Sequence, residues 1–117
     1  AAASLTSGQK YKLHFSDETH GILGSGGGIR HAEKFLRGSG NFLVCNGDEV
    51  LFFKQSEGFK KFFAEHTASG AIATLLTTDH PEVGTHLKGL RVDQNQNITE
   101  FSVKEKGLAH FTGVFAF

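Results

Sequence analysis

Residues 42–48 read Phe-Leu-Val-Cys-Asn-Gly-Asp, a short apolar run that ends in a polar turn. An uninterrupted run of this length is typical of a strand buried on both faces, as in a parallel sheet covered by helices. The Asn-Gly-Asp that follows would then lie at the carboxyl end of the strand, where open α/β sheets bind ligands. The stretch therefore predicts the centre of the fold and one place where chemistry would occur.

Amphipathic helices are predicted on both sides of this strand. Residues 26–37 place four apolar side chains on one face and charged side chains on the other, and Ser25 precedes them as a candidate N-cap. Residues 56–67 repeat the pattern with phenylalanines, and Ser56 is the candidate cap. A glycine follows each helix, as expected where a helix ends.

Further strands are predicted by alternating or continuous apolar residues. They cover residues 12–15, 71–77, 87–92, 98–103 and 111–117. The third and fourth of these flank a polar Gln-Asn-Gln-Asn turn and are expected to form a hairpin. Because strands and helices alternate and crossovers are right-handed, we expect an α/β fold with a mostly parallel sheet and flanking helices.

The composition is that of one compact globular domain. The chain has 117 residues, close to the roughly 100–150 of a common domain, with 38% hydrophobic and 21% charged residues. Its 12 basic and 12 acidic residues cancel, which argues against a nucleic-acid partner. No apolar run approaches the roughly 20 residues that span a bilayer. The single cysteine, Cys45, favours the reducing cytoplasm.

A glycine-rich segment, Gly-Ser-Gly-Gly-Gly at residues 24–28, directly precedes the first helix. Backbone amides that no Cβ shields, next to the positive end of a helix, suit ligand binding. The dinucleotide fingerprint fails because Ile29 stands where a glycine is required, and no Gly-Lys-Ser/Thr completes a P-loop. A plain turn is the alternative interpretation, and the residues alone leave both open.

Asp48 is a second candidate, because it follows a buried strand directly. Mg²⁺ takes one or two protein carboxylates and completes its shell with phosphate oxygens and water. An ordinary turn aspartate is the alternative. The seven histidines lack the spacing of zinc ligands, and no Gly-x-Ser-x-Gly elbow indicates a serine hydrolase.

Four segments, read in order, resemble one family. They are Phe-Ser-Asp-Glu at 15–18, Leu-Gly-Ser-Gly-Gly-Gly-Ile at 23–29, the stretch at 42–48, and Phe-Thr-Gly-Val at 111–114. This order is similar to that of the sugar-1-phosphate nucleotidyltransferases, or NDP-sugar pyrophosphorylases, and the resemblance implies a Rossmann-like domain. The family's Gly-x-Gly-Thr-Arg triphosphate loop and its second metal-binding Asp are not in this sequence. We therefore expect residues 1–117 to form a single, incomplete nucleotidyltransferase domain, its central segment.

The resemblance also implies roles for individual residues. The glycine loop would place its backbone against the nucleotide base, and Asp48 would be the catalytic residue that ligates Mg²⁺ beside the phosphates. The implied nucleotide-binding residues are Gly24, Ser25, Gly26, Gly27 and Gly28, and the implied sugar-binding residues are Asn46, Glu105, Lys106, Thr112 and Gly113.

The implied reaction is Mg²⁺-dependent transfer of a nucleotidyl group from an NTP to a sugar-1-phosphate, giving NDP-sugar and pyrophosphate. The longer protein would work in the cytoplasm with these two substrates, without nucleic acid or membrane. We expect this chain alone to be inactive and to self-associate through uncovered apolar faces. Two alternatives stay open: a non-catalytic nucleotide- or sugar-binding regulatory domain, and a flavodoxin-like domain that binds flavin.

Overall fold

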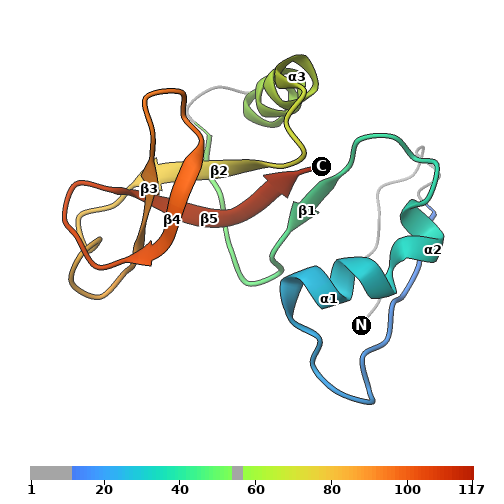
Figure 1. Ribbon diagram of the computed structural model, residues 1–117. Helices are drawn as coiled ribbons and strands as arrows, with labels where there is room; N and C mark the ends of the chain where they lie inside the picture. Colours follow the sequence, from blue (N-terminus) through green and yellow to red (C-terminus); the bar gives the residue numbers. More distant parts are fainter. Residues whose placement is uncertain (1–11, 54–56) are drawn as a thin grey trace. The chain divides into compact units, whose positions relative to one another are not determined.

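A computed structural model describes residues 12–53 and 57–117 (Figure 1). The chain divides into two compact units, Ala1–Gly40 and Asn41–Phe117, and each is described by itself. In the described parts of both, no helix combines the length and the apolar character needed to cross a membrane.

The described part of the first unit contains two short helices where the sequence predicts one. Helix α1 covers Gly24–His31 and α2 covers Glu33–Leu36, with Ala32 between them. Because α1 begins at Gly24, Ser25 lies inside the helix, and its prediction as the N-cap is wrong. The Glu18 carboxylate stands near this end of the helix instead, accepting a hydrogen bond from the Leu23 amide at 3.0 Å.

The predicted strand at residues 12–15 is also wrong, since this segment has no regular secondary structure. A strand needs a neighbour for its backbone hydrogen bonds, and the described part of the first unit contains no other strand. The segment is held by aromatic stacking, with the His14 and Phe35 ring centroids 4.5 Å apart. Phe15 remains 81% exposed.

Five strands form the sheet of the second unit: β1 (Leu43–Cys45), β2 (Thr74–Asp79), β3 (Gly89–Val92), β4 (Ile98–Val103) and β5 (Ala109–Ala116). Strand β5 lies at the centre, between β1 and β2 (Figure 1). The prediction that residues 42–45 form a central strand buried on both faces is therefore wrong: β1 lies at an edge, and Leu43 and Cys45 are exposed. Its residue Ala116 is aligned with Leu43 on one side and Thr74 on the other. Strand β3 joins β5 through the Leu90–Ala109 pair, and β4 pairs with β3.

The predicted mostly parallel sheet is wrong, because every pairing between the five strands β1–β5 is antiparallel. Strands β1 and β2 do run in the same direction, since each is antiparallel to β5. Helix α3 (Gly58–Ser69) connects them in the chain, as a crossover connects parallel strands. However, β5 occupies the place between them, so the two strands are not neighbours. The chain is α/β, but without the parallel sheet that a Rossmann-like domain implies.

The predicted hairpin is confirmed as β3 and β4. Its turn is closed by Asp93, whose Oδ1 accepts hydrogen bonds from the backbone amides of Asn97 and Asn95, both at 2.8 Å. Hydrogen bonds to a carboxylate favour its charged form, and those from Asn97 and Asn95 lower the pKa of Asp93.

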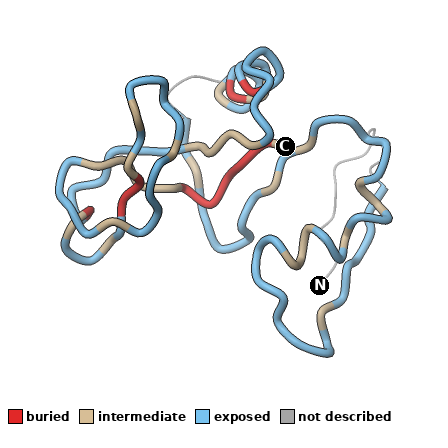
Figure 2. Tube along the Cα trace, in the orientation of Figure 1, coloured by how far each residue is buried: buried red, intermediate tan, exposed pale blue. Residues whose placement is uncertain are grey.

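The core of the second unit lies between α3 and the end of β5. Phe62 of α3 packs with Val114 and Ala116 of β5. Figure 2 shows buried residues on these two elements and also on β3 and in the 82–87 turn. The second predicted helix is thus confirmed, while its expected cap, Ser56, lies outside the described residues. Elsewhere large apolar side chains remain exposed, with Phe52 at 91%. Self-association through such side chains stays a prediction.

Candidate functional site

Asn46 and Gly113, two of the predicted sugar-binding residues, are in contact in the second unit. The Asn46 backbone amide donates a hydrogen bond to the Gly113 carbonyl at 2.9 Å. The Asn46 side chain lies directly over Gly113, because a Cβ on this glycine would be 2.7 Å from Asn46 Nδ2. We call this contact the Asn46–Gly113 corner. It joins the residue after β1 to the middle of β5.

A bulge in β5 creates the corner. Between the pairs Leu75–Phe115 and Thr77–Phe111, β2 advances by two residues while β5 advances by four. Gly113, at the middle of the bulge, has φ +76°, which an L side chain rarely adopts. Thr112 is buried beside it, and its hydroxyl donates to the Leu76 carbonyl at 2.9 Å. The Thr112 hydroxyl therefore fixes the bulge to β2.

Asp48 lies two residues after Asn46, in a turn that leaves its side chain exposed. Its carboxylate makes no hydrogen bond or ion pair with any residue in the ranges 12–53 and 57–117. A turn aspartate that stabilised the local backbone would accept bonds from nearby amides, as Asp93 does. The Asp48 carboxylate is thus exposed to solvent, without the backbone hydrogen bonds that Asp93 accepts in its own turn.

Glu105 and Lys106 lie in the turn before β5, and two contacts hold this segment. The Glu105 carboxylate accepts a hydrogen bond from Arg91 at 2.7 Å. Gly84 lies so close to the backbone of residues 105–106 that a Cβ on this glycine would be 2.6 Å from the Lys106 backbone nitrogen. The contacts of this segment are therefore with β3 and the 82–87 turn, whereas those of Asn46 are with β5.

The glycine segment belongs to the first unit, and it is helical rather than a loop. Gly24 to Gly28 form the first turns of α1. Two of these glycines allow close approach: a Cβ on Gly28 would be 2.7 Å from Glu18 Oε1, and one on Gly27 would be 2.7 Å from Leu23 Cβ. A Cβ on Gly26 would meet nothing within 4 Å. A site shared with Asp48, in the other unit, stays a prediction.

The chain is similar to curated proteins from lactobacilli. The "Bifunctional protein GlmU" of two strains of Lactobacillus delbrueckii subsp. bulgaricus is 36% identical over 106 residues, which covers 81% of this chain and 22% of that protein. The protein of the same name in Levilactobacillus brevis is 35% identical over 85 residues, which covers 72% of this chain and 18% of that protein. The resemblance to a segment of the sugar-1-phosphate nucleotidyltransferases is confirmed.

The chain spans about a fifth of the length of these relatives (22% and 18%). No protein-family model and no solved structure matches it. The similarity to nucleotidyltransferases thus comes from these relatives, and the structure adds the contact between two of the family motifs at the Asn46–Gly113 corner.

The chemistry of Asp48 fits the Mg²⁺ that a nucleotidyltransferase implies. No group of three or more His, Cys, Asp or Glu side chains among the described residues is placed to hold a metal ion. Mg²⁺ does not require such a group, because it is commonly bound by one or two carboxylates together with substrate phosphates and water. One exposed carboxylate with no other partner among the described residues is compatible with this mode of binding.

Three charged residues contact the predicted site residues or their neighbours but were not themselves predicted as site residues. Glu18 borders the glycine segment, Arg91 contacts Glu105, and Glu100 contacts Arg91. The hairpin could have indicated one of these contacts, since Arg91 and Glu100 carry opposite charges on paired strands. The contact of Glu105 with Arg91 depends on the path of the turn before β5, which no local pattern indicates.

Replacing Gly84 by alanine should destabilise the chain more than the same change at Gly107. Both glycines have positive φ, +89° and +81°, so alanine meets similar backbone strain at either place. Only at Gly84 does the new Cβ also press on the backbone of residues 105–106. We expect Gly84→Ala to lower the free energy of unfolding by about 1–3 kcal/mol more than Gly107→Ala, measured by urea denaturation. Equal losses would show that the 82–87 turn does not constrain this segment.

Proposed function

We propose that this chain is a segment of a longer protein, called here the parent protein, that transfers a nucleotidyl group from an NTP to a sugar-1-phosphate. An oxygen of the sugar phosphate attacks the α-phosphorus, the bond from that phosphorus to the bridging β-phosphate oxygen breaks, and pyrophosphate leaves. Bound Mg²⁺ would supply charge neutralisation at the phosphates. The protein's own contribution is positioning and electrostatic stabilisation, so none of its residues needs to act as a nucleophile.

The Asn46–Gly113 corner is the observation that supports this proposal most. The Asn-Gly-Asp and Thr-Gly motifs lie far apart in the sequence, yet the side chain of one covers the backbone of the other. Thr112 fixes the bulge on one side, and the Asp48 carboxylate is exposed two residues beyond Asn46. In this proposal the exposed Asn46 side-chain amide binds the sugar, Gly113 holds that amide in place from below, and Asp48 binds Mg²⁺ beside the phosphates.

Glu18 supports a neutral base rather than a phosphate as the ligand of the glycine segment. Its carboxylate accepts a hydrogen bond from the Leu23 backbone amide and lies close to Gly28, in the N-terminal half of α1. A negative charge already placed at this end of the helix disfavours a second anion there. A nucleotide base is uncharged and binds through hydrogen bonds and packing, so it is compatible with the carboxylate. Gly24, Ser25, Gly26, Gly27 and Gly28 are accordingly proposed to face the base.

Gly26→Ala in the parent protein tests the proposed base site. The new Cβ meets no atom of this chain within 4 Å, and alanine favours a helix over glycine by roughly 0.5–1 kcal/mol. We expect an unchanged or higher melting temperature together with a KM for NTP raised about tenfold, the effect of roughly 1.4 kcal/mol of lost binding. The KM for the sugar phosphate should stay the same.

Gly28→Ala is the comparison, because its Cβ would displace the Glu18 carboxylate, so its melting temperature should rise less than that of Gly26→Ala. If Gly26→Ala leaves the KM for NTP unchanged, the glycine segment does not contact the base. If the parent protein binds nucleotide or sugar phosphate but releases no pyrophosphate from any pair of substrates, it is a non-catalytic binding module, and nucleotidyl transfer is not its function.

A further inference from the structure

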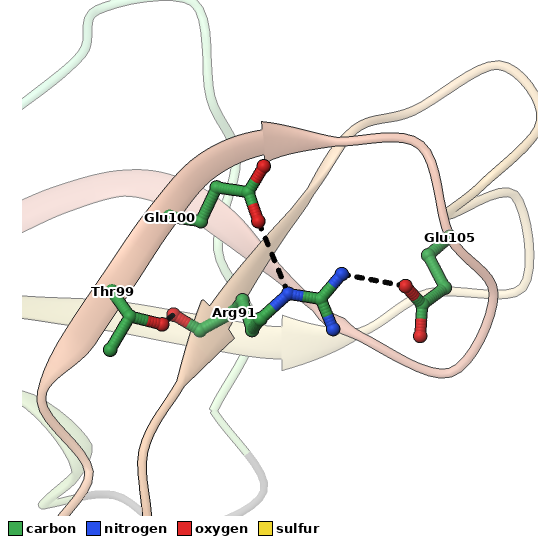
Figure 3. A network of polar contacts seen from close by, with 4 residues as sticks. All are labelled: Arg91, Thr99, Glu100 and Glu105. Atoms are coloured by element: carbon green, nitrogen blue, oxygen red, sulfur yellow. Dashed lines mark hydrogen bonds and ion pairs between the residues drawn. The ribbon is translucent and has the colours of Figure 1, made fainter.

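Arg91 of β3 lies between two carboxylates in the second unit (Figure 3). Its Nε donates to Glu100 Oε2 at 3.2 Å, and its Nη2 donates to Glu105 Oε2 at 2.7 Å. Thr99 adds a hydrogen bond from its hydroxyl to the Arg91 carbonyl at 3.2 Å. The guanidinium is thus fixed to β4 on one side and reaches the turn before β5 on the other.

Stability does not explain this arrangement well. The side chains of Arg91, Glu100 and Glu105 are 42%, 58% and 54% exposed, and exposed ion pairs contribute little to folding. Two carboxylates around one guanidinium also leave a net negative charge, whereas one carboxylate would balance it. What the arrangement does provide is geometry, because the planar guanidinium fork holds each partner in a defined direction.

The Glu105 segment is therefore held at its backbone by Gly84 and at its side chain by Arg91. Arg91 occupies Oε2 of Glu105, while Oε1 makes no hydrogen bond to any residue that the structure describes. A carboxylate fixed through one oxygen presents the other in a constant place, where it can accept a hydrogen bond from a sugar hydroxyl.

We propose that Arg91 is a positioning residue for the sugar-1-phosphate, which it serves by orienting the Glu105 carboxylate toward a sugar hydroxyl. This inference rests on the proposed function. Glu100 holds the other arm of the guanidinium and has no contact with Glu105 of its own in the network of Figure 3. Glu100→Gln provides the matched control, because glutamine removes one carboxylate charge from the network but can still accept the hydrogen bond from Arg91 Nε.

The test compares four variants of the parent protein in steady-state kinetics: Arg91→Ala, Glu105→Gln, the double variant, and Glu100→Gln. We expect Arg91→Ala and Glu105→Gln each to raise the KM for sugar-1-phosphate about tenfold, as expected for one lost charged hydrogen bond. The kcat and the KM for NTP should stay within about twofold in both, and Glu100→Gln should change all three values by less than twofold. The double variant should be no worse than Glu105→Gln alone, since Arg91 acts through Glu105.

Side-chain NMR of Arg91 gives a readout besides activity. The Nη–H signals of Arg91 should shift in Glu105→Gln, and unchanged signals would overturn the positioning contact itself. Additive losses in the double variant, or equal losses for both substrates in Arg91→Ala, would overturn the inference while leaving nucleotidyl transfer intact. A wild-type parent protein without nucleotidyl transfer would instead overturn the proposed function, and the sugar-binding role with it, even where the NMR contact persists.

Discussion

Replacing Asp48 by asparagine is expected to lower the turnover of the parent protein by about two orders of magnitude or more, the usual effect of removing one electrostatic group that stabilises a transition state. Asparagine keeps the shape of the side chain but removes the charge that would bind Mg²⁺. The fold should be retained, because Asp48 is exposed and bonds to no other described residue. Pyrophosphate release, measured over a range of Mg²⁺ concentrations beside a melting curve, checks both parts.

The neighbouring Glu49→Gln is the control for this prediction. Glu49 is also exposed, and the variant Glu49→Gln removes the same charge one residue farther along the chain. The family motif, however, ends at Asp48. We expect this variant to keep turnover close to that of the wild type. Turnover of Asp48→Asn at the wild-type level would show that Asp48 is an ordinary turn residue, and equal losses in both variants would indicate a general effect of charge.

Gly113→Val is expected to have the largest effect on stability, lowering the free energy of unfolding of the chain by roughly 2–5 kcal/mol. The first cause is the φ of +76°, which a β-branched residue does not adopt without strain. The second is steric, since the new side chain would collide with Asn46, whose Cγ and Cβ lie 3.0 and 3.1 Å from the Cβ position. Such a loss is a large part of the roughly 5–15 kcal/mol that stabilises a domain.

Gly47→Ala is the matched control at the same corner. Gly47 has no positive φ, and a Cβ there would meet nothing within 4 Å, so urea denaturation should show little change. Combining Gly113→Val with Asn46→Ala should recover much of the steric loss, because alanine removes Nδ2 and Cγ but keeps the Cβ at 3.1 Å. The backbone part of the loss should remain. If Gly113→Val is as stable as Gly47→Ala, the Asn46–Gly113 corner does not exist in the folded chain.

Local patterns in the sequence predict the single elements of this fold better than their arrangement. The alternation in residues 98–103 predicts β4 within its observed bounds, and the phenylalanines of α3 predict the helix that covers the core. The direction of β5 relative to its neighbours could not be predicted in this way, because a strand buried on both faces has the same apolar pattern in a parallel and in an antiparallel sheet. Residues 111–117 therefore indicated a strand without showing that it lies between β1 and β2.

In the candidate site, too, single residues could be predicted from local motifs, whereas their contacts in space could not. Asp48 and the Asn-Gly-Asp turn follow from a local motif, but the contact of Asn46 with Gly113 depends on the bulge in β5. The Leu23 amide, just before α1, donates to Glu18, which lies five residues earlier and is not a usual capping residue. Contacts between residues distant in the sequence are set by tertiary packing, and patterns read within a short window do not contain them.

The position of β5 between β1 and β2 also has a consequence for how the chain is made. A ribosome synthesises β1, α3 and β2 before β5, which is the last strand in the sequence. Until β5 emerges, β1 and β2 lack the strand with which both pair, so their facing edges have open hydrogen-bonding groups. Folding of this sheet therefore waits for a late, long-range step, and the nascent chain is most exposed to aggregation and to capture by chaperones during that interval.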